Sequence, residues 1–201
     1  MTDEQNLTEE KYILTIDMGT TAFKSAIFDC SGREVASATE EYQIQTPQPG
    51  WAEMDPERYI TLFQNVIARA LDKAQVPKDQ LVTLGISVQG ETSVFLDSSK
   101  KPLRSAILWC DTRALTEAEE IVDAFGSTTI QNHTGQVGCD ALWPGAKLLW
   151  LKKHEQDVFA NIAHILHLNG YFAYLLTGRM AEDDSILGSS IYWNINTRQY
   201  W

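Results

Sequence analysis

The stretch from Tyr12 to Phe28, with the sequence YILTIDMGTTAFKSAIF, constrains the fold of this chain more than any other. Two apolar runs flank a polar turn that contains Gly19, and the first run ends at Asp17. Apolar runs of this length predict buried strands, and the glycine between them predicts a tight reversal of the chain. The N-terminus is therefore expected to begin a sheet with a hairpin.

The turn itself, Met18-Gly19-Thr20-Thr21, allows two interpretations. Its backbone N–H groups and two hydroxyls can form a concave nest for phosphate oxygens, beside which Asp17 can hold Mg²⁺ directly or through water. The same residues can close an ordinary hairpin, in which the aspartate and the glycine only satisfy the turn. The turn alone does not decide between a phosphate site and a simple reversal.

Local signals in the first half of the chain predict an α/β protein. Gly32 marks a second tight turn, so residues 34–42 are expected to complete a three-stranded antiparallel meander that starts a mixed sheet. Asp55 opens an amphipathic helix as its N-cap, with a proline at the first helical position. Residues 81–88 then predict another buried strand.

The second half is expected to be mainly helical, after two further strands near residues 94–97 and 106–109. Asp111 or Thr112 can cap a helix over residues 114–125. A second helical region is predicted after Gly135 and a third from Pro144 to Lys153. No internal repeat or flexible linker interrupts the chain, so a single α/β unit is predicted.

Charge and cysteine content narrow the function. The 201 residues carry a formal net charge of −11, which disfavours nonspecific binding to nucleic acid and to anionic membranes. The three cysteines, Cys30, Cys110 and Cys139, show no paired spacing and predict free thiols in a reducing cytoplasm. Residues 1–11 are polar and are expected to be a disordered lead-in, and no apolar run reaches membrane-spanning length.

Polar side chains follow several predicted strands, where ligand sites of open α/β sheets tend to lie. They are Gln89 and Glu91, Asp111 and Arg113, and the later segment 183–185. Each has a structural explanation of its own, as a strand end, a helix cap or a solvated loop. Together, amide, carboxylate and guanidinium groups suit a polyhydroxylated ligand, because carboxylates accept hydroxyl protons and arginine donates in a fork.

Two histidines are a weaker candidate for a metal site. His164 and His167 have the i,i+3 spacing of neighbours on a helix, but no cysteine or further histidine completes a ligand set. Packing or surface histidines are the preferred interpretation.

Six segments in order resemble the FGGY carbohydrate kinases, the family of xylulose, gluconate, glycerol and related kinases, along nearly the whole chain. They are IDMGTTAFKSAIFD, GWAEMDPE, LGISVQGET, ILWCDTR, PGAKLLWLKKHE and LLTG. The resemblance implies an actin-like, ribonuclease H-like ATPase fold, with helices on both faces of a mixed sheet. It also implies two such domains with the active site in the cleft between them, where ATP and Mg²⁺ serve to phosphorylate a sugar hydroxyl.

The same resemblance implies roles for two groups of residues. The group near the metal and the ATP phosphates, in which Asp17 is the catalytic and metal-binding residue, is Asp17, Gly19, Thr20, Thr21 and Lys24. The group that binds the sugar is Gln89, Glu91, Asp111 and Arg113. Chemistry of this kind depends mainly on positioning and charge neutralisation.

Residues 12–201 resemble only the N-terminal, substrate-side domain of these kinases. The family's general-base aspartate lies in a Gly-Asp motif in the segment that follows, and the second, ATP-binding domain follows as well. The isolated chain is therefore predicted to be inactive without the C-terminal domain of its parent. Its interdomain face, exposed in isolation, can make it self-associate as a homodimer.

The identity of the sugar rests on Gly90. Glycerol kinases tend to carry Gln-Arg-Glu-Thr where this chain has Gln89-Gly90-Glu91-Thr92, and xylulose kinases tend to have Gln-Met-His. The missing arginine counts against glycerol and leaves room for a longer sugar, so a pentulose such as xylulose is predicted. Gluconate or another polyol, and a non-catalytic sugar-binding or regulatory module of the same fold, remain as alternatives.

Overall fold

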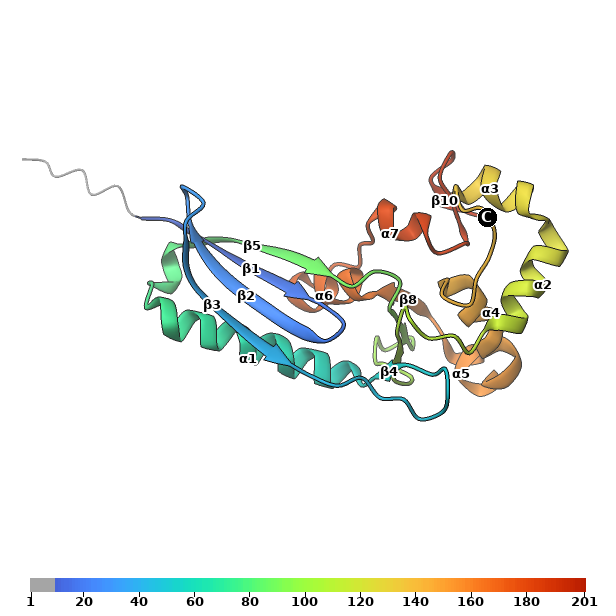
Figure 1. The fold of residues 1–201 in the computed structure, drawn as a ribbon, viewed down its shortest axis with the longest axis horizontal. Coiled ribbons are helices and arrows are strands. Elements are labelled where there is room, and N and C mark those ends of the chain that lie inside the picture. The colour runs from blue at the N-terminus through green and yellow to red at the C-terminus, as the bar shows by residue number, and fades with distance from the viewer. Residues whose placement is uncertain (1–9) are drawn as a thin grey trace, which may run out of the picture. The chain divides into compact units, whose positions relative to one another are not determined.

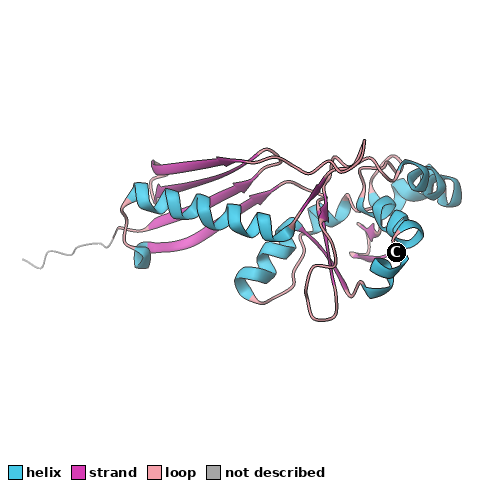
Figure 2. Ribbon diagram, turned by 90° about the horizontal axis from the view of Figure 1, so that it is seen from below, coloured by secondary structure: helices cyan, strands magenta, loops and turns pink. Residues whose placement is uncertain are grey.

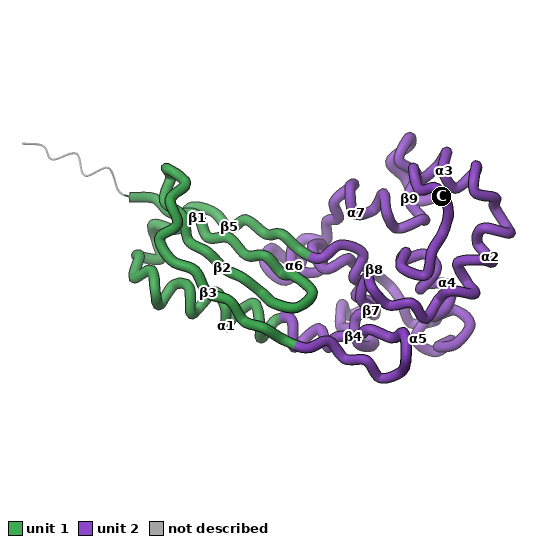
Figure 3. The backbone as a smooth tube through the Cα atoms, viewed as in Figure 1, with its two compact units in different colours: residues 1–42, 60–88 green, residues 43–59, 89–201 purple. Residues whose placement is uncertain are grey.

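The structure, a computed structural model that describes residues 10–201, contains two main sheets, each in its own unit of the chain (Figures 1 and 3). Among the described residues, unit 1 consists of residues 10–42 and 60–88, and unit 2 consists of residues 43–59 and 89–201. Most of the expected disordered lead-in, residues 1–9, lies outside the described residues.

Unit 1 is built on a four-stranded mixed sheet in the order β3-β2-β1-β5. Its strands are β1 (Tyr12–Met18), β2 (Ala22–Asp29), β3 (Glu34–Glu41) and β5 (Leu81–Val88). The first three strands form an antiparallel meander, and β5 lies parallel to β1. The predicted mixed sheet and its opening meander are confirmed.

One face of this sheet forms the core of unit 1. Because side chains alternate along a strand, Leu14 and Met18 of β1 share a face with Ile27 and Phe23, which lie opposite them on β2. All four side chains are buried. Helix α1 (Pro56–Ala74) runs along the sheet (Figure 2), and its residues in unit 1 that are fully buried are Leu62, Val66 and Ala70.

Helix α1 begins as the sequence predicts and is tied to the sheet by hydrogen bonds. The Asp55 carboxylate accepts a hydrogen bond from the backbone N–H of Glu57 at 3.0 Å, as expected of an N-cap. Further along, the Arg69 guanidinium donates to the carbonyl of Thr39 in β3 at 2.7 Å. Among the described residues of unit 1, the only other helical segment is the short 3₁₀ turn η1 (Lys78–Gln80), which leads into β5.

Unit 2 contains an antiparallel sheet in the order β4-β7-β6-β8 and most of the helices. The strands are β4 (Glu53–Met54), β6 (Ser93–Leu96), β7 (Ala106–Ile107) and β8 (His164–His167), with a separate hairpin of β9 (Trp193–Asn194) and β10 (Gln199–Tyr200). The helices are α2 (Leu115–Phe125), α3 (Ser127–Thr134), α4 (Pro144–His154), α5 (Gln156–Asn161), α6 (Leu168–Thr177) and α7 (Asp184–Gly188). A core cluster joins sheet and helices through Phe95, Ile107, Ala114, Ala118, Ala146, Trp150 and Leu151.

Two sequence-based expectations about helices are wrong, whereas the helix predicted from Pro144 is confirmed as α4. The second helical region lies before Gly135 rather than after it, because Gly135 adopts a left-handed conformation (φ +76°) and ends α3. Helix α2 has Ala114 at its N-cap, without a side-chain cap. The Asp111 carboxylate, expected as one of two possible caps, makes its hydrogen bonds elsewhere.

Cys30, Cys110 and Cys139 are free thiols, as predicted. Burial raises the pKa of the Cys139 thiol to about 12. Within residues 10–201, none of the helices has both the length and the apolar character needed to cross a membrane.

Candidate functional site

The turn after β1 is tight and pinned within unit 1. The backbone N–H of Gly19 donates to the carbonyl of Ala22 at 3.1 Å, and a Cβ added at Gly19 would meet the same oxygen at 3.1 Å. The Tyr42 hydroxyl donates to the Gly19 carbonyl at 2.7 Å, and the Tyr42 N–H donates to the Thr21 carbonyl at 3.0 Å. Residues 19–21 therefore keep a defined shape next to Asp17, as a phosphate-side turn requires.

Asp17 and Lys24 lie directly opposite each other in the β1–β2 register. Their neighbours Met18 and Phe23 are fully buried on the core face, so the alternation of side chains puts Asp17 and Lys24 on the face turned away from α1. Both side chains are exposed. Cross-strand neighbours of this kind have Cβ atoms about 5 Å apart, so a carboxylate and an ammonium group are available together at one end of the sheet.

Residues 10–201 do not form a complete magnesium site from their own side chains. No group of three or more histidine, cysteine, aspartate or glutamate side chains within residues 10–201 is arranged to hold a metal ion. Mg²⁺ at phosphate-transfer sites commonly takes one or two carboxylates and completes its octahedron with phosphate oxygens and water. An exposed Asp17 fits that mode, with one protein oxygen donor and open space around it.

Gln89 and Glu91 follow β5 and belong to unit 2. The Gln89 amide donates to the Tyr59 hydroxyl at 3.3 Å, and the Glu91 carboxylate accepts from the Ser189 hydroxyl at 2.6 Å. Between them, a Cβ added at Gly90 would meet no atom within 4 Å. Two polar side chains therefore flank an open position, at the place where the sequence predicts sugar contacts.

Asp111 and Arg113 are brought together, but as a buried ion pair. Both side chains are 0% exposed, and Arg113 Nη2 lies 2.7 Å from Asp111 Oδ2. Asp111 Oδ2 also accepts from the Ala52 N–H at 2.6 Å, and its Oδ1 accepts from both the N–H and the Nε of Arg113. Four hydrogen bonds from the protein thus occupy the Asp111 carboxylate, which explains why it caps no helix.

A network that the sequence did not predict extends from this pair. Arg113 Nη2 also donates to Glu53 Oε1 at 2.6 Å, and the same oxygen pairs with Arg104, which in turn contacts Glu155 at 2.5 Å. The partners in these contacts are 51 or 60 residues apart. The only feature of the sequence that pointed to this network was the position of Glu53 within the GWAEMDPE segment.

Trp51 covers the Arg113 guanidinium. The guanidinium carbon lies 3.7 Å from the centroid of the Trp51 ring and 5.0 Å from that of Trp150. Arg113 Nη1 is buried and has no hydrogen-bond partner among the described residues. The cation–π contact with the two indole rings compensates for this missing hydrogen bond. The indole rings of Trp51 and Trp150 meet edge to face at 5.3 Å.

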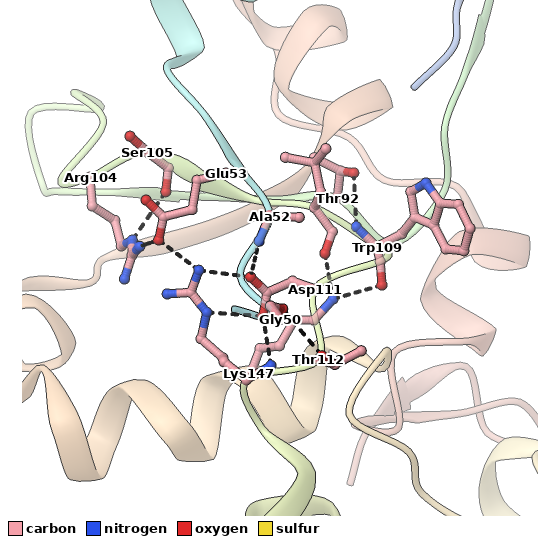
Figure 4. Close-up of polar contacts among 12 residues, drawn as sticks. Gly50, Ala52, Glu53, Thr92, Arg104, Ser105, Trp109, Asp111, Thr112 and Lys147 are labelled. Carbon is pink, nitrogen blue, oxygen red and sulfur yellow. Dashed lines mark hydrogen bonds and ion pairs between the residues drawn. The ribbon is translucent and has the colours of Figure 1, made fainter. Parts of the chain in front are cut away.

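Lys147, in the PGAKLLWLKKHE segment, supports the same region from α4. Its fully buried ammonium donates to the carbonyls of Leu108 and Trp109 at 2.6 and 3.0 Å (Figure 4). Burial lowers the pKa of Lys147 to about 8, against an opposing contribution from the nearby Asp111 carboxylate. The lysine holds the chain in place immediately before Asp111.

Replacing Lys147 by methionine is expected to remove a pH-dependent part of the stability. The folded protein releases the Lys147 proton near pH 8, whereas the unfolded chain keeps it up to about 10.5. The free energy of unfolding of the wild type should therefore rise between these values, by on the order of 3 kcal/mol at most. Urea unfolding at pH 7.5, 9 and 10 measures this gain.

The gain should be smaller in Lys147→Met and unchanged in Lys78→Met, a control at an exposed lysine. Equal pH slopes in all three proteins would contradict the assignment of the low pKa to Lys147.

The two histidines considered for metal binding lie on strand β8 instead of a helix. Positions i and i+3 of a strand point to opposite faces, so His164 and His167 cannot share an ion. The His167 backbone N–H donates to Glu182 Oε1 at 2.7 Å, and its ring Nδ1 lies 3.3 Å from Glu182 Oε2. His167 is therefore a buried histidine, which agrees with packing, one of the two roles (packing or surface) that the sequence favoured.

Comparisons with known proteins agree on one family. The pattern described as the N-terminal domain of the FGGY family of carbohydrate kinases matches residues 12–201. A probable L-xylulose kinase of Pasteurella multocida is 33% identical over 94% of this chain and 39% of its own length. A glycerol kinase of Petrotoga mobilis is 36% identical over 71% of this chain and 28% of its own length.

Solved structures show the same relationship. The xylulose kinase from Rhodospirillum rubrum superimposes with a TM-score of 0.88 at 25% identity, over 95% of this chain and 39% of that one. The gluconate kinase from Lactobacillus acidophilus superimposes with a TM-score of 0.86 at 27% identity, over 96% of this chain and 38% of that one. The chain thus spans about two fifths of the length of such relatives.

Proposed function

Because this chain belongs to the FGGY family of carbohydrate kinases and has their actin-like ATPase fold, we propose that it is the substrate-side domain of an ATP-dependent sugar kinase. The reaction would transfer the γ-phosphate of ATP to a hydroxyl of a small sugar, most favourably a pentulose such as xylulose. The observation that carries the substrate class is the open position at Gly90 between Gln89 and Glu91.

One group of residues in this chain would act on the ATP phosphates and the metal ion, and another group would bind the sugar. Bound Mg²⁺ would neutralise charge on the phosphate oxygens during transfer. Asp17 supplies a carboxylate for that ion, and Lys24 places a positive charge opposite it in the register of β1 and β2. The turn of Gly19, Thr20 and Thr21 is assigned to the phosphate side, where Thr20 and Thr21 supply its polar groups. The Gly19 N–H, which donates to the Ala22 carbonyl, keeps this turn tight.

On the sugar side, we assign direct contacts to Gln89 and Glu91. The amide can donate and accept, and the carboxylate accepts sugar hydroxyls. Asp111 and Arg113 act on the sugar pocket through the backbone that they hold, because their side chains are 0% exposed. The base that accepts the hydroxyl proton is assigned to none of residues 10–201.

A coupled assay of ATP consumption tests this function on the full-length protein that carries the domain. Pentuloses, gluconate and glycerol are compared as acceptors, and xylulose is expected to give the highest kcat/KM. A clear preference for gluconate or glycerol would overturn the substrate assignment. Binding of sugars by calorimetry without any ATP consumption would instead support the non-catalytic module.

Replacing Gly90 by arginine is expected to shift the preference toward glycerol. The new side chain enters open space, so the fold should persist, and its guanidinium would grip a small triol and crowd a longer sugar. The ratio of kcat/KM for xylulose to that for glycerol should fall at least about tenfold, the effect of roughly 1.4 kcal/mol.

Gly138→Arg is a matched control, because a Cβ at Gly138 also meets no atom within 4 Å. An unchanged ratio in Gly90→Arg would show that position 90 does not face the sugar.

A further inference from the structure

Glu91 is held in an uncommon backbone conformation. Its φ is +55°, and the N–H of Thr92 donates to the carbonyl of Gly90 at 2.7 Å, which closes a three-residue turn around Glu91. A γ-turn with positive φ at its centre is rare and strained for a residue with a side chain. The turn is anchored on its far side, because the Thr92 carbonyl accepts from the Leu168 N–H at 3.0 Å.

A second segment, far away in sequence, fixes the side chain that this turn presents. The Ser189 Oγ lies 2.6 Å from Glu91 Oε1 and 3.0 Å from the Ile186 carbonyl. A hydroxyl has one proton, and the shorter contact to a charged acceptor is the stronger one. Ser189 therefore donates to Glu91, which leaves the carboxylate with lone pairs for a further hydroxyl.

Ser189 is itself held from both sides. It follows the short helix α7, whose N-cap Asp183 accepts from the Ser185 N–H at 2.8 Å. On the other side, the Ser190 carbonyl accepts from the Gly145 N–H at 2.9 Å. A Cβ added at Gly145 would meet that carbonyl at 3.0 Å, so the contact requires glycine or a shift of the segment.

The backbone conformation of Ile191, the residue after Ser190, shows how firmly this segment is constrained. Ile191 is buried and β-branched, yet its φ is +73°. Its carbonyl accepts from the indole N–H of Trp201 at 2.9 Å. A β-branched residue adopts such a strained conformation only where the contacts around it hold it there. Conformations of this kind cluster at functional sites.

We propose that Ser189 is a positioning residue for sugar binding, which sets the orientation of the Glu91 carboxylate toward the substrate. The proposal rests on the proposed function, because Glu91 must contact the sugar for its orientation to matter. The strained turn sets only the direction of the Cα–Cβ bond of Glu91 and leaves the side-chain torsions free. The hydrogen bond from Ser189 selects among the rotamers of the remaining bonds, so that one carboxylate arrangement is present before the sugar arrives.

The test compares Ser189→Ala, Ser189→Thr and the wild type in the full-length protein, by steady-state kinetics with the preferred sugar. Loss of one hydrogen bond to a charged group should raise the sugar KM about tenfold. The kcat should change less than about threefold, because an interaction made equally in ground and transition state affects KM only. The KM for ATP should not change, and Ser189→Thr, which keeps the hydroxyl, should restore the sugar KM.

Two further variants sharpen the result. Gly145→Ala should raise the sugar KM in the same way, because it pushes against the Ser190 carbonyl and so displaces the neighbouring Ser189. Ser98→Ala removes an exposed hydroxyl elsewhere in unit 2, and it should behave as the wild type.

An unchanged sugar KM in Ser189→Ala, in a protein whose wild type is active, would overturn the proposal and leave the proposed function standing. Equal losses in sugar KM, ATP KM and melting temperature would indicate a purely structural role and would overturn it as well. A wild type that phosphorylates no sugar would overturn the proposed function first.

Discussion

Replacing Asp17 by asparagine is expected to lower kcat for sugar phosphorylation by at least about a thousandfold in the full-length protein, at saturating Mg²⁺ and ATP. The substitution keeps the size of the side chain and removes the charge that would hold the ion. Asp17 is exposed at the end of β1, on the face of the sheet turned away from α1. The melting temperature should therefore stay within about 1 °C of the wild type, because exposed substitutions change stability little.

Asp79→Asn is the matched control, since Asp79 is also an exposed aspartate of unit 1, in the 3₁₀ turn before β5. It should retain normal turnover. Near-normal turnover of Asp17→Asn would remove Asp17 from the reaction and return the turn at residues 18–21 to a simple hairpin. A lowered melting temperature together with lost activity would mean that the substitution acts by destabilising the fold.

The first unit could be predicted from sequence because its signals are local. Gly19 and Gly32 mark the two reversals of the meander, and the alternation of apolar residues determines which face of each strand is buried. Residues 81–88 were predicted as a buried strand and form β5 with those bounds, but the expected burial is wrong, because no residue of β5 is buried and Val82 is 53% exposed. Each of these inferences depends on residues a few positions apart, over which backbone geometry alone restricts the chain.

The polar network of unit 2 could not be predicted in the same way. Asp111 has the residue type and position of a helix cap, but Ala52 and Arg113 satisfy its carboxylate, and the contact with Ala52 joins residues 59 positions apart. Side-chain pairing across such separations depends on tertiary packing and leaves no periodic pattern. Ser189 is a similar case, since its partner Glu91 is 98 residues away.

Replacing Arg113 by alanine is expected to lower the free energy of unfolding by about 3–5 kcal/mol. The side chains of Asp111 and Glu53 are only 0% and 11% exposed, and both carboxylates would lose a charged donor. Truncation also leaves a gap beneath the Trp51 ring, on which the guanidinium stacks at 3.7 Å. Urea unfolding of the full-length protein, followed by tryptophan fluorescence, measures the loss.

Arg113→Lys separates charge from geometry. A lysine keeps the positive charge but cannot reach Asp111 and Glu53 with a planar fork, so it should recover only part of the lost stability. Arg33→Ala is the control, because Arg33 pairs with Asp29 through a side chain that is 78% exposed, and its urea midpoint should not move measurably. A raised sugar KM in Arg113→Ala at unchanged stability would mean that the guanidinium reaches the sugar directly. A large loss of stability instead means that Arg113 serves the site by holding Asp111 and Glu53 in place.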